Sequence, residues 1–109
     1  MARPLLTGIL MSALSLSALP TLAADLENGQ KLARKCSACH GKDGLSKVPD
    51  VPNLAGQPAL YLEKSLKGFR DGKREDRRMT LMAEPLTDAE IKDLAGWYAS
   101  FELTVTMLE

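Results

Sequence analysis

The chain has 109 residues, with 14 basic and 14 acidic side chains, so its formal net charge is zero. A chain without excess positive charge has no electrostatic basis for holding nucleic acid, and we exclude that class of partner. It contains two cysteines and one histidine, and all three lie within one stretch of five residues.

The first 24 residues have the features of a secretory signal peptide. Arg3 supplies positive charge, residues 5–19 are apolar and uncharged, and small residues suit peptidase cleavage near Ala23 or Ala24. The same segment is about long enough to span a bilayer, so an uncleaved anchor is the alternative. Pro20 and the small residues favour cleavage, after which we expect no stable membrane insertion.

After the signal peptide we expect one domain, residues 25–101, and a tail, residues 102–109. The first helix is predicted from Glu27 into Cys36. Gly29 lies inside it and lowers its helical propensity, so we expect another helix to pass close to this glycine. The predicted inward positions of the helix include Leu26, Leu32 and Ala33.

The two cysteines and the histidine form the run Cys36-Ser37-Ala38-Cys39-His40. On one helical turn, positions i, i+3 and i+4 share a face, so both thiols and the imidazole can point at one porphyrin. Two thiols can add to the two haem vinyl groups while the imidazole binds the iron. This run is the attachment signature of haem c.

Other interpretations of the run explain less of it. A thioredoxin-like dithiol needs a βαβ context, which this chain of helices and loops lacks. A structural zinc site needs four ligands, and only three candidates exist without a carboxylate. A simple disulfide remains open in an exported protein, but it leaves His40 without a role.

Export and covalent haem agree, because cytochromes of this type acquire haem outside the cytoplasm, and the bacterial periplasm is the natural compartment. About 85 residues remain after cleavage, which is few for a large apolar core. A buried porphyrin would complete that core. We therefore expect the haem-free chain to be largely unfolded.

Residues 41–56 are rich in glycine, proline and small polar residues and predict a loop. A second helix is expected to begin with Pro58 at its first helical position. Its predicted inward face contains Leu62, Leu66 and Phe69, widened by Leu60 and Tyr61.

The last helix has the clearest local signals. Thr87 and Glu90 predict a capping box, and the apolar positions that follow have helical spacing. These positions are Ile91, Leu94, Ala95, Tyr98 and Ala99, with Trp97 and Phe101 beside them. In the tail that follows, apolar residues alternate with polar ones, but a lone strand has no partner, so we expect a loosely docked tail.

A second axial ligand must come from a methionine, because the chain has no second histidine. Met79 and Met82 lie before the last helix, where a loop could cross the distal haem face, and Met107 lies in the tail. Basic residues crowd this segment and would steer an acidic partner if they surrounded the haem edge. Interspersed acidic residues favour a solvated charged segment instead. The residues concerned are Arg70, Lys73, Arg74, Arg77 and Arg78, with Asp71, Glu75 and Asp76.

Nearly all of residues 27–101 resembles the class I cytochromes c, especially small bacterial cytochrome c553 and c4-like domains. The resemblance is carried by Gly29, the haem-attachment run with Gly41, the run Pro52-Asn53-Leu54-Ala55-Gly56-Gln57-Pro58, Tyr61-Leu62, Met79 to Met82 and Trp97-Tyr98. It implies an all-α class I cytochrome c fold, with three to four helices around one haem and the terminal helices crossing near Gly29 and Trp97.

The resemblance also implies roles for two residues. In this family a proline carbonyl twelve residues after the histidine accepts the imidazole Nδ1 hydrogen, and Pro52 has that spacing from His40. Such a bond fixes the tautomer and leaves Nε2 for iron. In similar domains the methionine ligand lies seven residues before the leucine that precedes the last helix. That rule selects Met79, with Met82 lining the pocket as the alternative ligand.

Iron held by histidine and methionine has no open coordination site, so we expect one-electron transfer between redox partner proteins and no enzymatic activity. The donor would be a dehydrogenase or a quinol-oxidising complex, and the acceptor an oxidase or reductase. A gas sensor or peroxidase-like protein with an open distal site is one alternative. An electron-accepting subunit of a dehydrogenase complex is another, in which the tail could contact the partner.

Overall fold

The computed structural model describes residues 1–2, 4–5, 8, 13–18 and 22–109. These residues contain five helices and no strand. None of the described helices is long and apolar enough to cross a membrane. Part of the predicted signal peptide lies outside the described residues. The helices are α1 (Leu26–Ala33), α2 (Ser37–His40), α3 (Ala59–Arg70), α4 (Arg77–Ala83) and α5 (Asp88–Ala99).

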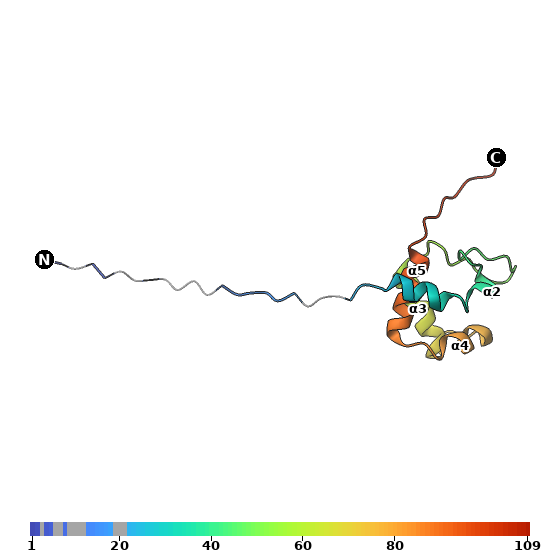
Figure 1. Cartoon of the computed structure of the whole chain (residues 1–109), viewed down its shortest axis with the longest axis horizontal. Coiled ribbons are helices and arrows are strands. Elements are labelled where there is room, and N and C mark those ends of the chain that lie inside the picture. The colour runs from blue at the N-terminus through green and yellow to red at the C-terminus, as the bar shows by residue number, and fades with distance from the viewer. Residues whose placement is uncertain (3, 6–7, 9–12, 19–21) are drawn as a thin grey trace.

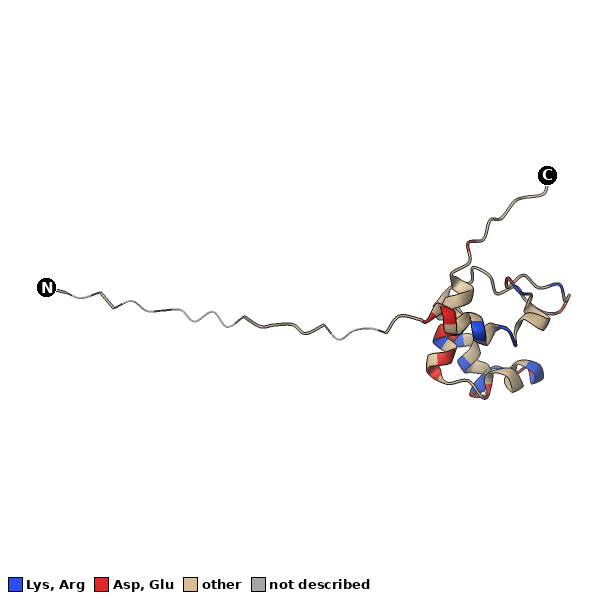
Figure 2. Ribbon diagram, in the orientation of Figure 1, with Lys and Arg blue, Asp and Glu red and all other residues tan. Residues whose placement is uncertain are grey.

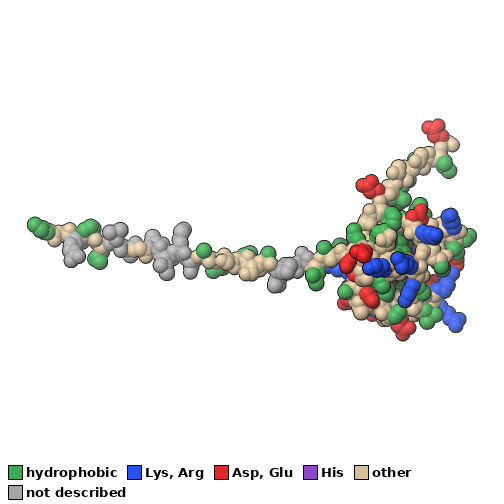
Figure 3. All heavy atoms as spheres, viewed as in Figure 1, with side chains coloured by type: hydrophobic (Ala, Val, Ile, Leu, Met, Phe, Trp, Pro, Cys, Tyr) green, Lys and Arg blue, Asp and Glu red, His purple; other side chains and the backbone are tan. Residues whose placement is uncertain are grey.

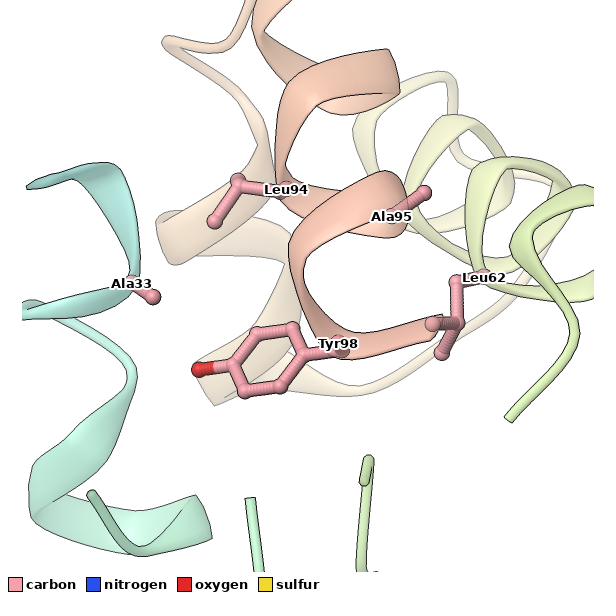
Figure 4. Packing of buried hydrophobic residues seen from close by; sticks show 5 residues of the cluster. All are labelled: Ala33, Leu62, Leu94, Ala95 and Tyr98. Carbon is pink, nitrogen blue, oxygen red and sulfur yellow. The ribbon is translucent and has the colours of Figure 1, made fainter. Parts of the chain in front are cut away.

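The core forms where α5 packs against both α1 and α3, and α3 in turn packs against α4. Figure 1 shows α1, α3 and α5 grouped together, with α2 and α4 on one side of them. The all-α prediction is confirmed, although the expected three to four helices are five because α2 and α4 are short separate helices. Ala33, Leu62, Leu94, Ala95 and Tyr98 form the buried cluster drawn in Figure 4.

The crossing of α1 and α5 depends on Gly29. A Cβ built on this residue would lie 2.1 Å from the Asp93 carbonyl oxygen and 2.8 Å from Trp97 Cβ. Only a residue without a side chain allows the two backbones to approach so closely. The predicted close approach of a helix near Trp97 is therefore confirmed.

The capping signals of α5 are also confirmed. Thr87 Oγ1 accepts a hydrogen bond from the Glu90 amide at 3.2 Å, and the Glu90 carboxylate accepts one from the Thr87 amide at 2.9 Å. At the end of α5, Trp97 contacts Phe101 just beyond the helix in an edge-to-face arrangement, with ring centroids 5.1 Å apart. Residues 102–109 contain neither helix nor strand and leave the domain at the end of α5 (Figure 1).

Two helix boundaries differ from prediction. The expected helix from Glu27 to Cys36 ends at Ala33, because the next amides bond three residues back instead of four, as in Cys36 N to Ala33 O at 2.9 Å. Pro58 precedes α3 instead of forming its first residue, and its carbonyl accepts the first helical hydrogen bond, from Leu62 N at 3.1 Å.

Some predicted inward side chains are exposed. Leu60 is 82% exposed and Tyr61 48%, so the apolar face of α3 is narrower than its composition indicates. Leu26 is 45% exposed at the start of α1. These residues lie in the first turns of their helices, where fewer other parts of the chain pack against the side chains.

Candidate haem site

Cys36, Cys39 and His40 of the haem-attachment run lie on one short helical turn. Cys36 is the N-cap of α2, and its carbonyl accepts hydrogen bonds from the amides of Cys39 at 3.2 Å and His40 at 2.9 Å. The two cysteines form no disulfide with each other, and Cys36 is half-buried while Cys39 is exposed. The turn between α1 and α2 places this run at the edge of the helical core (Figure 1).

His40 is buried, with 6% of its surface exposed. Its Nδ1 atom lies 2.8 Å from the backbone carbonyl oxygen of Pro52. A carbonyl oxygen only accepts hydrogen bonds, so Nδ1 carries the proton and Nε2 keeps its lone pair. A lone pair on Nε2 is what a metal ion requires from a neutral imidazole.

The loop that carries Pro52 is held by several contacts. The Ser46 amide donates to Asn53 Oδ1 at 2.7 Å, and Ser46 Oγ donates to the Cys39 carbonyl at 3.0 Å. Farther along, the Gly56 amide donates to the Tyr98 carbonyl at 2.9 Å and ties the loop to α5. These bonds define the path of the loop and therefore the place of the Pro52 carbonyl.

The segment expected to be a distal loop is helical. Met79 and Met82 both lie in α4, whose N-cap Asp76 accepts a hydrogen bond from the Met79 amide at 2.9 Å. Met79 is half-buried, Met82 is 38% exposed, and Met107 in the tail is 85% exposed. Helix formation there follows from the side-chain cap and from a run without glycine or proline.

The residues around the run fit a haem group. In the part of the chain that the structure describes, Ile91 and Leu94 are the two large side chains that are fully covered, which is a small core for a folded domain. Among the described residues, the Tyr98 hydroxyl is a buried polar atom without a hydrogen-bond partner. Two cysteines that form no disulfide, a buried imidazole with an available Nε2 and a small core together suit a large, covalently attached ligand that contains a metal ion.

The charged residues before and within α4 make several separate contacts and do not form one cluster. Arg70 pairs with Asp71 at 2.9 Å and with Asp88 at 2.7 Å, and Arg74 lies over the Phe69 ring at 4.6 Å. Basic positions of α4 and acidic positions at the start of α5 lie in different parts of the domain in Figure 2. On the face drawn in Figure 3, basic side chains are interspersed with apolar and acidic ones. This arrangement favours a solvated charged segment over a single docking patch.

Two features were not anticipated from sequence. Arg78 pairs with Asp50 at 3.0 Å, across 28 positions of chain, and no local pattern joins these residues. The Tyr98 hydroxyl is buried among apolar side chains. Its only sequence signal was a phenol at an inward position of the last helix.

Comparison with known proteins places these features in a family. Residues 26–100 match the cytochrome c family model. Cytochrome c4 of Pseudomonas aeruginosa is 40% identical over 105 residues, which cover 96% of this chain and 52% of that protein. Cytochrome c-554(548) of Halomonas halodenitrificans is 46% identical over 83 residues, covering 73% of this chain and all of the relative.

Solved structures agree with the sequence comparison. Reduced recombinant cytochrome c4 from Pseudomonas stutzeri superposes with a TM-score of 0.70 at 38% identity, over 76% of this chain and 48% of that one. The chain thus spans about half the length of the cytochrome c4 proteins it matches. A protein of Thiomonas intermedia called thiosulfate dehydrogenase electron acceptor is 39% identical over 71 residues, or 64% of this chain and 33% of the relative.

The match covers the attachment run, the loop after it and every described helix. The chain therefore belongs to the cytochrome c family, as a c4-like class I c-type cytochrome domain that binds haem c covalently.

Proposed function

We propose that this cytochrome acts in electron transfer, carrying one electron at a time between redox partner proteins outside the cytoplasm. The observation that carries the proposal is the 2.8 Å contact between His40 Nδ1 and the Pro52 carbonyl, which commits the imidazole to one tautomer. Bound haem c supplies reversible one-electron chemistry at its iron. Its partners would be an electron-donating and an electron-accepting protein.

On the proximal side, Cys36 and Cys39 would hold the haem through two thioether bonds, and His40 would bind the iron through Nε2. The Pro52 carbonyl keeps the imidazole oriented and makes Nε2 more electron-rich. Because the loop carrying Pro52 is hydrogen-bonded to the run itself through Ser46 and Cys39, the ligand need not reorient when the iron changes oxidation state.

On the distal side, we propose Met79 as the second axial ligand. It is less exposed than Met82, and its amide is held by the Asp76 cap at the start of α4. A thioether sulfur stabilises ferrous iron and raises the reduction potential. With both axial positions filled by the chain, no substrate binds iron, so we propose a carrier without enzymatic activity.

Apolar side chains should exclude water from the porphyrin. Leu54 and Leu66 are partly buried and pack against the cluster that contains Leu62 and Tyr98. A dry environment disfavours the extra charge of ferric iron and so also raises the reduction potential.

We also propose that the protein is exported and resides in the periplasm, with its signal peptide, residues 1–24, cleaved near Ala23 or Ala24. Asp25 directly follows the proposed cleavage sites and is the N-cap of α1, accepting a hydrogen bond from the Asn28 amide at 3.0 Å. The first helix is therefore capped by a residue that cleavage would leave in place. Residues 25–101 would form the mature domain and residues 102–109 its tail.

Replacing the methionines one at a time tests the axial assignment. In the ferric holoprotein, Met79→Ala should abolish the far-red band of methionine-to-iron absorption, lower the reduction potential and let carbon monoxide bind the reduced form readily. Met82→Ala and the tail control Met107→Ala should keep the band. Loss of the band in Met82→Ala alone would transfer the role to Met82. A wild-type protein that lacks the band and binds carbon monoxide would indicate a gas-binding or peroxidase-like protein instead.

The similarity to a protein called thiosulfate dehydrogenase electron acceptor favours a second candidate, an electron-accepting subunit of a dehydrogenase complex. In that case the tail would be available to a partner, since Val105 and Met107 are 81% and 85% exposed. Size-exclusion chromatography of native periplasmic extract distinguishes the two. A free carrier elutes near its own mass, and a subunit elutes with its dehydrogenase.

A further inference from the structure

Tyr98 presents a buried group that the proposed electron-transfer mechanism does not use. The residue is 3% exposed, and its hydroxyl has no hydrogen-bond partner among the described residues. Native proteins rarely leave a buried hydroxyl unpaired, because the group loses its hydrogen bonds to water without replacement. The hydroxyl therefore calls for a partner that haem binding would provide.

The direction of the side chain indicates that partner. In Figure 4 the Tyr98 ring extends from α5 toward the end of α1, and its oxygen points to the turn that leads from Ala33 into α2. Cys36, the N-cap of α2, packs against the same cluster. Burial raises the pKa of the Cys36 thiol, and the neighbouring Tyr98 hydroxyl partly offsets that rise. Because Cys36 packs against the cluster that contains Tyr98, the two side chains lie in the same part of the core, and among the described residues the Tyr98 hydroxyl has no hydrogen-bond partner.

Haem attachment changes what the Cys36 sulfur can do. The thiol adds across a vinyl double bond: a C–S bond forms, the C=C π bond is lost, and the sulfur proton's equivalent ends on the neighbouring carbon, with no change in oxidation state overall. The resulting thioether has no hydrogen and only accepts hydrogen bonds. Beside it, the Tyr98 hydroxyl is a donor without an acceptor.

We propose that Tyr98 is a positioning residue for the haem, whose hydroxyl donates a hydrogen bond to the Cys36 thioether sulfur. This inference rests on the proposed attachment through Cys36. The bond fixes the sulfur on the rim of the porphyrin and draws electron density toward the hydroxyl. Less electron density at the porphyrin favours ferrous iron, so the bond raises the reduction potential.

The chain offers a matched control, since it has two tyrosines. Tyr98→Phe removes one oxygen and keeps the ring that packs in the core. Tyr61→Phe makes the same change on α3, where the side chain is 48% exposed and its pKa is lowered by hydrogen bonds with Ser65 and Arg74. Both holoproteins would be compared with wild type by redox titration and by resonance Raman spectroscopy of the thioether C–S stretch. The pyridine haemochrome spectrum verifies two thioether bonds in each protein.

We expect Tyr98→Phe to lower the reduction potential and shift the C–S band, while Tyr61→Phe changes neither. An unchanged C–S band in Tyr98→Phe would overturn the proposed partner, even if the potential fell. A shifted band with an unchanged potential would overturn the tuning role. A wild-type haemochrome spectrum typical of one thioether or none would instead contradict the attachment through Cys36 and Cys39, independently of Tyr98.

Discussion

Arg78 of α4 forms an ion pair with Asp50, with 3.0 Å between Nη2 and Oδ2. In the sequence, each lies close to a proposed haem-site residue: Arg78 is next to Met79, and Asp50 is two positions before Pro52. The pair therefore joins the segment expected on the distal side to the loop that orients His40. Both side chains are well exposed, at 60% and 68%, so the pair should contribute at most about 1 kcal/mol.

Replacing Arg78 by Gln should loosen this connection. We expect carbon monoxide to bind the reduced protein up to about fivefold faster at low salt, because losing a pair that contributes at most about 1 kcal/mol favours the open arrangement by no more than that amount. The difference should shrink at high salt, where the wild-type pair is screened. Stopped-flow mixing with carbon monoxide measures it. Arg77→Gln, at the neighbouring position on α4, is the control, and an equal effect in both variants would exclude a specific role for the ion pair.

Gly29→Ala should destabilise the holoprotein by about 1–3 kcal/mol, because the new Cβ would overlap the Asp93 carbonyl on α5. Gly68→Ala is the matched control within α3. There the added Cβ would meet Arg74 Cβ at 3.4 Å, an ordinary contact, so removing a helical glycine should stabilise the protein by about 0.5–1 kcal/mol. Urea unfolding followed by circular dichroism gives both values. Equal stability of the two variants would contradict the close crossing of α1 and α5.

Acid should weaken the ion pair between Arg70 and Asp71 at the end of α3. The pKa of Asp71 is lowered, chiefly by its hydrogen bond with Arg70. A carboxyl with a lowered folded-state pKa stabilises the fold above its unfolded-state pKa, about 3.9, and loses this contribution as pH falls through the folded-state value. We would measure the melting temperature between about pH 7 and pH 2. Below about pH 4, it should fall less steeply in Arg70→Gln than in wild type. An unchanged pH dependence below about pH 4 would show that the pair does not contribute. Lys64→Gln, an exposed lysine on α3, is the control for lost charge alone.

Without haem, the chain should be largely unfolded. Two large side chains are fully buried, and the Tyr98 hydroxyl has no partner among the described residues, so the protein part alone has little to stabilise it. A Cys36→Ser, Cys39→Ser double variant, which cannot form thioethers, should give a far-ultraviolet circular dichroism spectrum with little helix. Ser37→Ala, between the two cysteines, should retain haem and helix. A compact double variant with a cooperative unfolding transition would contradict this expectation.

Sequence patterns predicted a helix well where the whole pattern lies within that helix. The Thr87–Glu90 box and the apolar spacing after it lie within one helix, so α5 could be located from sequence. The boundaries at Ala33 and Pro58 were missed by a few residues or less, because the end of a helix depends on which carbonyls remain available to the next amides. The helical state of α4 was missed because its short run also suits a loop.

The chemistry of the site follows from the sequence alone. Two thiols and an imidazole at positions i, i+3 and i+4 share a face on any helical turn, whatever surrounds that turn. The family resemblance already named the Pro52 carbonyl as the partner of His40, but the other two contacts came to light in the folded chain: Asp50 opposite Arg78, and Tyr98 beside Cys36. Such contacts join residues far apart in the chain, so they depend on the path of a glycine- and proline-rich loop and on close packing, which no local pattern encodes.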